Sequence, residues 1–349
     1  MRQRVAGVGP VQVGLTFVGA AIGAGFATGQ ELLQFFNFFG RDGLFGIVLA
    51  SALLGLFSFS VLELGRRLSA GTYGDVIRHA AGGVVGAPVD YLVTFFLFGG
   101  LVSMVAGSGA LMNEQFGWNP SHGAVLLAAS AAVTVIFGLE GIVDSMAILV
   151  PVMLAGTAVT GLTAALKTGY LIHPNYWRSP ASAPIPFWPA SAVVYASYNL
   201  VLTMAVLAPL GARLGSREDS VRGAIAGGAG LGAAAIIGYV AIASHLPEAA
   251  AYQVPMMFVA GRIHPALRTS YALIILASIY TTAVTALYGF ITRVAPAGPA
   301  RTAVVMAAPA AALVLASLGF TTVVRVLYPS VGISGLVLLL ALAVELPTL

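Results

Sequence analysis

The stretch Gly19-Ala20-Ala21-Ile22-Gly23-Ala24-Gly25-Phe26 lies in the middle of a long apolar segment, residues 11–36. Inside a helix, glycine is less favourable than alanine by about 1 kcal/mol per residue. Three of the first seven residues here are glycine, and Gly29 follows shortly after. The sequence therefore predicts that a helix over residues 11–36 is interrupted near Gly23.

Polar residues in the same segment favour this interruption over a simpler interpretation. Glycines also allow neighbouring membrane helices to pack closely without any break. Gln30, Glu31 and Gln34 follow the glycines directly, however, and polar groups within a membrane helix usually line a polar path. Non-helical backbone at membrane depth is tolerated when it is buried in protein or lines such a cavity.

The composition places the chain in a membrane. Of its 349 residues, 59% are hydrophobic and 8% are charged, whereas soluble domains carry about 25% charged residues. The sequence contains no cysteine, which excludes disulfides, thiolate metal sites and cysteine nucleophiles. The net charge of +4 comes without a basic stripe alternating with aromatic residues, so we expect no nucleic-acid partner.

A helix that crosses a bilayer needs about 20 mostly apolar residues, and ten apolar runs, separated by charged, proline or glycine residues, follow one another along the chain. We therefore predict an all-α integral membrane protein of about ten transmembrane helices, forming a single domain over residues 1–349. The predicted spans are residues 11–36, 44–63, 89–112, 123–137, 142–166, 190–207, 224–244, 267–291, 303–318 and 331–346. Two long connections, residues 173–188 and 245–265, are expected to cover the outer surface.

The positions of the basic residues predict the orientation, because Lys and Arg are retained on the cytoplasmic side. With both termini cytoplasmic, most of the basic residues lie in cytoplasmic segments. An even number of helices requires the same arrangement. We expect a multi-pass protein of a prokaryotic plasma membrane, as a monomer or homodimer in the lipid bilayer.

An interruption near Gly23 would create two helix ends of opposite partial charge. The outer half-helix would begin near Gly25, and free N–H groups of Gly23, Ala24 and Gly25, with Ala21 beside them, suit a carboxylate. The inner half-helix would end between Gly19 and Ile22, where free carbonyls suit a monovalent cation.

The stretch from Gly19 to Phe26 resembles, in register, the first-helix motif of the amino acid–polyamine–organocation (APC) transporter superfamily. The short chain is most similar to the YkvI-like amino acid permease family. The resemblance implies the leucine-transporter (LeuT) fold, a 5+5 inverted repeat with helices 1 and 6 broken around the substrate. Repeat one would cover residues 8–168 and repeat two residues 186–349.

The sixth predicted span contains the polar and aromatic cluster Tyr195-Ala196-Ser197-Tyr198-Asn199. The resemblance implies that this span is also interrupted, with Tyr195 or Tyr198 covering the apolar part of the substrate. Ser197 and Asn199 would then bind its polar groups. The alternative is two ordinary tyrosines that find partners in a packed helix.

Ser103, in the glycine-rich third span, completes the substrate-binding residues that we expect. It lies near Gly99, Gly100 and Gly107, which would leave room for a bulky substrate. The same glycines would equally allow close helix packing.

The resemblance also implies a sodium site. In sodium-coupled members of the superfamily, first-helix carbonyls meet a carbonyl of the eighth helix and two hydroxyls three and four residues later. Ser278, Thr281 and Thr282 have this spacing on one helix face, and Gly19 and Ile22 would supply the first-helix carbonyls. The threonines could instead bond carbonyls of their own helix.

Sodium is favoured over protons as the coupling ion. Proton-coupled relatives can place a lysine of the fifth helix at the cation site, but Lys167 lies at the outer end of the fifth span. Protonation of Glu31 remains open. An unpaired carboxylate in a membrane is costly, and Arg325, just before the tenth span, is a candidate partner of Glu31. The resemblance implies that such an ion pair would form an outer gate.

We therefore expect a secondary active transporter of an amino acid or related small solute, working by alternating access and coupled to sodium. A proton-coupled permease, and a receptor of the same fold that binds a nutrient without moving it, are the alternatives. No paired-histidine metal motif or Gly-x-Ser-x-Gly elbow is present, so neither an enzyme nor a cofactor is expected. Glu63, Asp75, Glu140 and Asp144 are expected to cap helix ends or face water.

Overall fold

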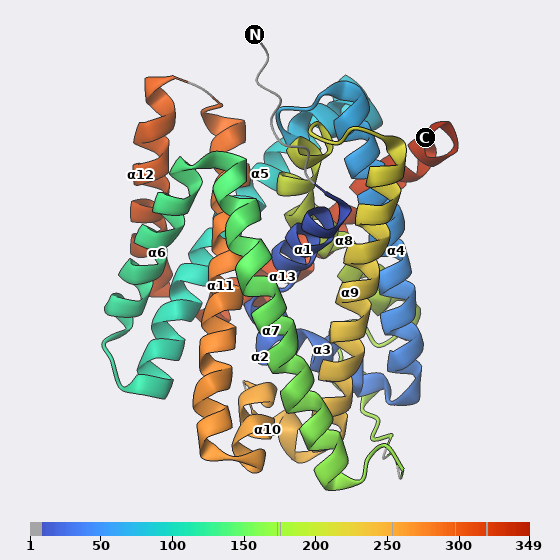
Figure 1. The fold of residues 1–349 in the computed structure, drawn as a ribbon, viewed down its shortest axis with the longest axis vertical. Coiled ribbons are helices and arrows are strands. Elements are labelled where there is room, and N and C mark those ends of the chain that lie inside the picture. The colour runs from blue at the N-terminus through green and yellow to red at the C-terminus, as the bar shows by residue number, and fades with distance from the viewer. Residues whose placement is uncertain (1–8, 173, 175, 253, 297, 319) are drawn as a thin grey trace.

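The computed structural model describes residues 9–172, 174, 176–252, 254–296, 298–318 and 320–349. At positions 85, 114, 299, 318 and 320–330 the description covers the backbone and not the side chain. The described chain is built from helices (Figure 1). The α-helices are α1 Pro10–Ala21, α2 Ala24–Thr28, α3 Gln30–Phe35, α4 Arg41–Leu68, α5 Tyr73–Phe116, α6 Pro120–Ile136, α7 Gly138–Thr168, α8 Trp188–Gly211, α9 Arg217–Ala243, α10 Pro255–Ile263, α11 Pro265–Val294, α12 Pro299–Leu315 and α13 Phe320–Glu345. Five short 3-10 helices lie at Asn37–Phe39, Pro180–Ser182, Glu248–Ala251, Ala316–Leu318 and Leu346–Thr348.

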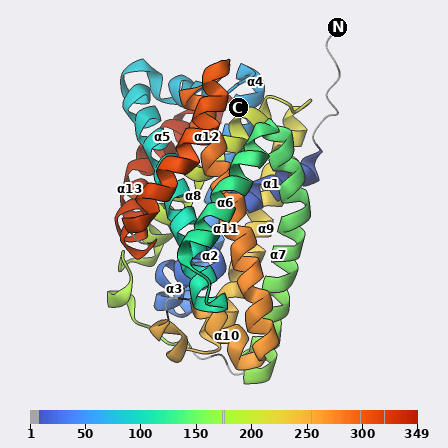
Figure 2. The same cartoon turned by 90° about the vertical axis from the view of Figure 1, so that its left-hand side faces the viewer.

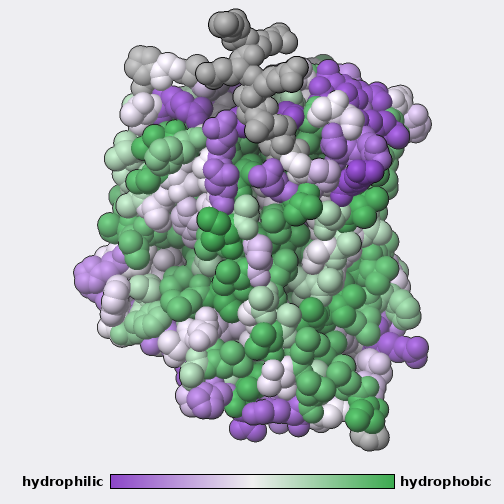
Figure 3. All heavy atoms as spheres, in the orientation of Figure 1, coloured by the Kyte–Doolittle hydropathy of each residue, from purple (hydrophilic) through white to green (hydrophobic). Residues whose placement is uncertain are grey.

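The shape and the surface fit a membrane protein. Helices α7, α9 and α11 run along the long axis in both ribbon views (Figures 1 and 2). Hydrophobic side chains cover the middle of the visible face, and hydrophilic ones gather at its two ends (Figure 3). Within the described residues, seven helices are long and apolar enough to cross a bilayer, and three further apolar helices are shorter.

Every predicted span overlaps a helix, with α1 to α3 together forming the first one. The total of ten crossings stays a prediction, because three of these helices are short. The connection over residues 245–265 is not a plain loop: it contains α10, which packs on α11, α7 and α9.

Small residues bring α9 onto α1 and bury the first span. A Cβ atom at Gly227 would overlap the ring of Phe17, and one at Gly223 would overlap Val13. Helix α1 also packs on α7 and α8, and Phe17 is completely buried. The glycines of α9 thus allow the close approach that encloses the first span in protein.

The predicted interruption of the sixth span is wrong. Helix α8 continues from Trp188 to Gly211, through Tyr195 and Asn199, without a break. The physical reason lies in the sequence: residues 195–199 contain neither glycine nor proline, and Pro209 stands only in the last turn of the helix. A polar cluster alone does not break a helix whose residues tolerate helical geometry.

Candidate functional site

The expected interruption of the first span is present at Ile22 and Gly23. Helix α1 ends at Ala21, and Gly23 is extended, with φ −89° and ψ −176°. Helix α2 then begins at Ala24, one residue earlier than expected. The Gly23 N–H donates to the Ala21 carbonyl at 3.0 Å, so this amide is not free for a ligand.

A second interruption follows at Gly29. Its φ of +85° lies in the left-handed region, where glycine is favoured, and α3 begins at Gln30 in a new direction. Gly29 itself is the signal for this turn, but from the sequence we expected only one interruption, near Gly23. The turn matters because it directs Glu31 back toward the first interruption.

Helix α11 brings hydroxyl groups to the end of α1. The Ile22 carbonyl accepts hydrogen bonds from Ser278 Oγ at 2.8 Å and Thr282 Oγ1 at 3.5 Å. Thr281 Oγ1 donates to the Ser278 carbonyl of its own helix at 3.0 Å, which is the alternative left open for the threonines. Ser278 is completely buried, and Thr281 and Thr282 are at most 4% exposed. Four of the five residues predicted to bind sodium therefore form a connected group of oxygen atoms.

Gly19, the fifth predicted sodium ligand, lies one turn before Ile22 on α1. A Cβ atom there would overlap Val150 of α7, so its lack of a side chain allows α7 to approach. Its carbonyl belongs to the last turn of α1, where carbonyl groups lack partners within the helix. The position is compatible with the predicted role, which stays a prediction.

Glu31 returns to the outer side of the interruption. Its carboxylate contacts Gly25, where a Cβ atom would overlap it, and it accepts a hydrogen bond from the Tyr198 hydroxyl of α8. Glu31 is 5% exposed. A carboxylate of the protein itself thus lies at the place where the sequence predicted the carboxylate of a solute.

No arginine, lysine or histidine side chain among those that the structure describes forms an ion pair with Glu31. Arg325, the predicted gating partner, is in α13 but its side chain lies outside the described ones. The Glu31–Arg325 gate therefore stays a prediction. The described partner of Glu31 is the neutral hydroxyl of Tyr198.

Aromatic rings pack together beside this carboxylate. The Phe35 ring lies 5.5 Å from that of Tyr195 and 5.9 Å from that of Tyr198, measured between centroids. Tyr195 and Tyr198 are 5.4 Å apart and nearly perpendicular. We name Gly25, Glu31, Phe35, Tyr195 and Tyr198 the Glu31 cluster.

Several polar atoms around α8 lack a partner. The Tyr195 hydroxyl, the Asn199 Oδ1 atom and the Ser103 hydroxyl are buried and have no hydrogen-bond partner among the described residues. Buried polar groups of proteins are generally paired, so these atoms are candidates for contact with a solute or water. The Asn199 Nδ2 atom is already used, because it donates to the Tyr195 carbonyl at 3.0 Å.

Ser197 differs from its neighbours on α8. Its hydroxyl donates to the Gly332 carbonyl of α13 at 3.0 Å, and a Cβ atom at Gly335 would overlap it. Ser197 therefore joins two helices, and we do not include it in the proposed solute site. Its polar side chain alone did not reveal which neighbour it would face.

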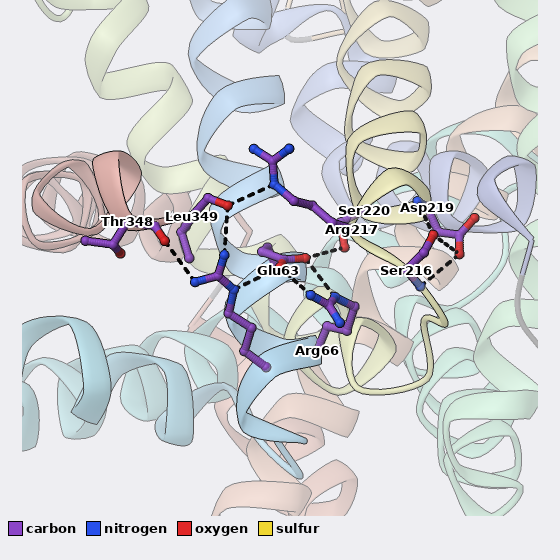
Figure 4. Close-up of polar contacts among 9 residues, drawn as sticks. Glu63, Arg66, Ser216, Arg217, Asp219, Ser220, Thr348 and Leu349 are labelled. Carbon is purple, nitrogen blue, oxygen red and sulfur yellow. Dashed lines mark hydrogen bonds and ion pairs between the residues drawn. The ribbon is translucent and has the colours of Figure 1, made fainter.

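Glu63 does not cap a helix or face water, contrary to expectation. It is completely buried near the end of α4 and accepts bonds from Arg66 at 2.6 and 2.9 Å, Arg67 at 2.9 Å and Ser220 of α9 at 3.1 Å (Figure 4). The spacing of three and four residues to the two arginines was readable in the sequence. By contrast, Asp75 caps α5 and Glu140 is exposed, as expected, and so is Asp144.

A second buried ion pair was missed altogether. Asp90 of α5 is 1% exposed and lies 2.5 Å from Arg293 of α11. Near the same end of α5, the Tyr73 hydroxyl lies 2.7 Å from Thr94 Oγ1, and burial raises the pKa of Tyr73 well above its usual range. The two residues of the pair are 203 positions apart, so local sequence spacing gave no sign of the contact.

No protein-family model matches this chain. It is similar over almost its whole length to two sequences of Bacillus subtilis (strain 168). Membrane protein YkvI is 27% identical over 337 residues, which cover 95% of this chain and 94% of YkvI. Protein YyaD is 26% identical over 332 residues, which cover 94% of each.

Solved structures share the fold at low sequence identity. MhsT in complex with L-phenylalanine superposes with a TM-score of 0.69 at 17% identity, over 94% of this chain and 87% of that one. A Na⁺-coupled sialic acid symporter superposes with a TM-score of 0.64 at 13% identity, over 91% of this chain and 75% of the symporter. The nucleobase-cation-symport-1 family transporter Mhp1 superposes with a TM-score of 0.54 at 16% identity, over 94% of this chain and 77% of Mhp1. The chain is therefore a helical membrane protein with the LeuT fold and a homologue of YkvI and YyaD.

Proposed function

We propose that this protein is a sodium-coupled secondary transporter of a small, amine-bearing solute of the amino acid type. The observation that carries the proposal is the meeting of the interrupted α1 with α11 at the Ile22 carbonyl, where Ser278 and Thr282 donate. Oxygen atoms of carbonyl and hydroxyl groups are the ligands that hard cations prefer. The fold neighbours include a symporter described as Na⁺-coupled, which supports the same ion.

The proposed mechanism follows from what joins α1 to α11. In the structure, the hydroxyls of Ser278 and Thr282 hold the Ile22 carbonyl directly. A sodium ion at this place would be bound by the same oxygen atoms from both helices, and it would fix α1 against α11 in one arrangement. A ligand shifts a conformational equilibrium by its difference in affinity for the two states. Sodium would thus favour the state in which the solute site beyond the interruption is formed.

The first experiment is a thermal-shift measurement on the purified protein with sodium or potassium chloride at equal ionic strength. A ligand of the folded state raises the melting temperature Tm, so we expect sodium to raise it more than potassium does. The Thr282→Ala variant should lose the difference. The matched control is Thr292→Ala, because Thr292 is buried in the same helix and its hydrogen bonds within the described residues go to carbonyls of its own helix, those of Tyr288 and Gly289.

Uptake into proteoliposomes separates a transporter from a receptor. A sodium gradient should drive accumulation of a solute that also raises Tm. Accumulation should stop when an ionophore collapses the gradient. Specific binding without accumulation would contradict transport and favour the receptor. Equal stabilisation by sodium and potassium would contradict the proposed ion.

Proton coupling is the second candidate, and one observation favours it: Glu31 is buried beside Tyr198 without a described cation. A carboxylate in such a place is costly when charged and can bind a proton instead. Uptake driven by a pH gradient in sodium-free buffer, and lost in Glu31→Gln, would replace sodium by protons in the mechanism.

A further inference from the structure

The Glu31 cluster contains a carboxyl group that has no described cation to neutralise its charge when it is ionised. Glu31 is 5% exposed, and its described hydrogen-bond donor is the hydroxyl of Tyr198. A buried charge is normally paired with an opposite charge or a metal ion, since leaving water is costly. A solute that carries an ammonium group would supply this opposite charge.

The rings around Glu31 suit such a cation. Phe35, Tyr195 and Tyr198 lie with centroids 5.4 to 5.9 Å apart, and the face of an aromatic ring attracts an ammonium group. Rings exclude water, which strengthens the attraction to a carboxylate beside them. Tyr195 is 2% exposed, and its hydroxyl is unpartnered within the described part of the chain, so it is available as a hydrogen-bond acceptor for an ammonium N–H.

Glu31 also disfavours binding of a solute carboxylate. Its own carboxylate contacts Gly25, in the first turn of α2, which is the position that a solute carboxylate would need. Two carboxylates at neighbouring positions in a water-poor site repel each other. An amine is attracted to the same place.

We infer that the solute is an organic amine recognised through its ammonium group by Glu31, with Phe35, Tyr195 and Tyr198 around it, and that a free carboxylate weakens its binding. This inference rests on the proposed transport function and names its substrate class. Glu31 serves as the counter-charge, Gly25 leaves room for its carboxylate, and Tyr198 orients it.

The test compares solutes that differ in one group. Phenylalanine is compared with phenethylamine, which lacks the carboxyl group, and leucine is compared with isopentylamine in the same way. Each amino acid is also compared with the corresponding acid that lacks the amino group. Binding is followed by thermal shift and by inhibition of uptake, in sodium buffer at constant pH. We expect the amines to raise Tm, the amino acids to raise it less, and the acids to have no effect.

Glu31→Gln keeps the size and the hydrogen-bond acceptor but removes the charge. We expect it to weaken amine binding at least about tenfold, since a hydrogen bond to a charged group is worth more than one to a neutral group. Glu248→Gln is the matched control, because Glu248 is exposed in the connection before α10. The wild-type comparison of amines with acids tests the inference even if Glu31→Gln folds poorly.

Three results would overturn the inference. One is that the amino acids bind and the amines do not, and another is that Glu31→Gln binds amines as well as the wild type does. The third is that no amine of the panel binds, while Glu31→Gln abolishes a response to pH, which would make Glu31 a proton site. Each of these leaves the sodium effect and its loss in Thr282→Ala intact, so failure of the substrate class is distinguishable from failure of the transport function.

Discussion

Glu31 and Glu63 are both buried glutamates, with 5% and 0% of their surface exposed, but their surroundings differ. Glu63 forms ion pairs with Arg66 and Arg67 and accepts a bond from Ser220. Glu31 has an aromatic surrounding and a hydroxyl donor. The same side chain therefore occurs once with its charge neutralised by the protein and once without a described cation.

The two glutamates illustrate how buried charges with a structural role differ from those with a binding role. Glu63 joins α4 to α9 through groups that all belong to the protein, so removing its partners should affect folding first. Glu31 has no described cationic partner, and a buried ionisable group without a counter-charge from the protein is a candidate for binding a ligand. Substitutions at the Glu63 site should therefore lower stability, whereas substitution of Glu31 should mainly reduce solute binding.

The largest effect is expected when Glu63 loses its cations. The double variant Arg66→Met/Arg67→Met leaves a buried carboxylate without a counter-charge, which typically costs about 3–5 kcal/mol of unfolding free energy. The loss should appear as a large decrease of Tm in detergent. Adding Glu63→Gln to the double variant should recover most of it, and a triple variant as unstable as the double would contradict this role of Glu63.

Glu31→Gln should behave in the opposite way. We expect its stability to stay within about 1 kcal/mol of the wild type or to increase, because the change removes a buried charge without a described cation and keeps an acceptor for Tyr198. Uptake of the solute driven by a sodium gradient should be lost. A decrease of Tm as large as that of the arginine double variant would show that Glu31 is mainly structural.

Gly25→Ala tests the space that the Glu31 carboxylate occupies. The new Cβ atom would overlap the carboxylate, and such overpacking typically costs about 1–3 kcal/mol. In a Glu31→Ala background the same change should cost much less, because the carboxylate is gone. Gly23→Ala is the milder comparison, since its Cβ atom would lie 3.2 Å from Thr282 Oγ1. Additive effects of Gly25→Ala and Glu31→Ala would contradict the contact.

The sequence predicted the parts of this site that depend on local backbone preferences. The interruption at Gly23 follows from glycine propensity, and the spacing of Ser278, Thr281 and Thr282 placed their hydroxyls on one face of α11. Both are properties of a few consecutive residues. The membrane location was likewise predictable, because the seven long apolar helices of the described chain show their apolar length within their own residues.

Contacts between distant segments were not predictable in the same way. The return of Glu31 to Gly25 depends on the left-handed turn at Gly29, and its bond to Tyr198 joins residues 167 positions apart. The pairing of Asp90 with Arg293 depends on how α5 packs on α11. The interruption expected in α8 failed for a related reason: it was carried over from a resemblance, while residues 195–199 themselves favour a continuous helix.

The smallest effect is expected at an ion pair that water reaches. Arg178 and Asp42 lie 3.1 Å apart, but their side chains are 55% and 36% exposed, and such pairs typically contribute about 0–1 kcal/mol. Asp42→Asn should therefore lower Tm only slightly, and the difference should vanish in high salt because exposed charges are screened. Asp90→Asn is the matched change at a pair whose carboxylate is 2% exposed, and it should lower Tm clearly more at every salt concentration. Equal effects of the two substitutions would show that burial does not decide what an ion pair contributes to the stability of this protein.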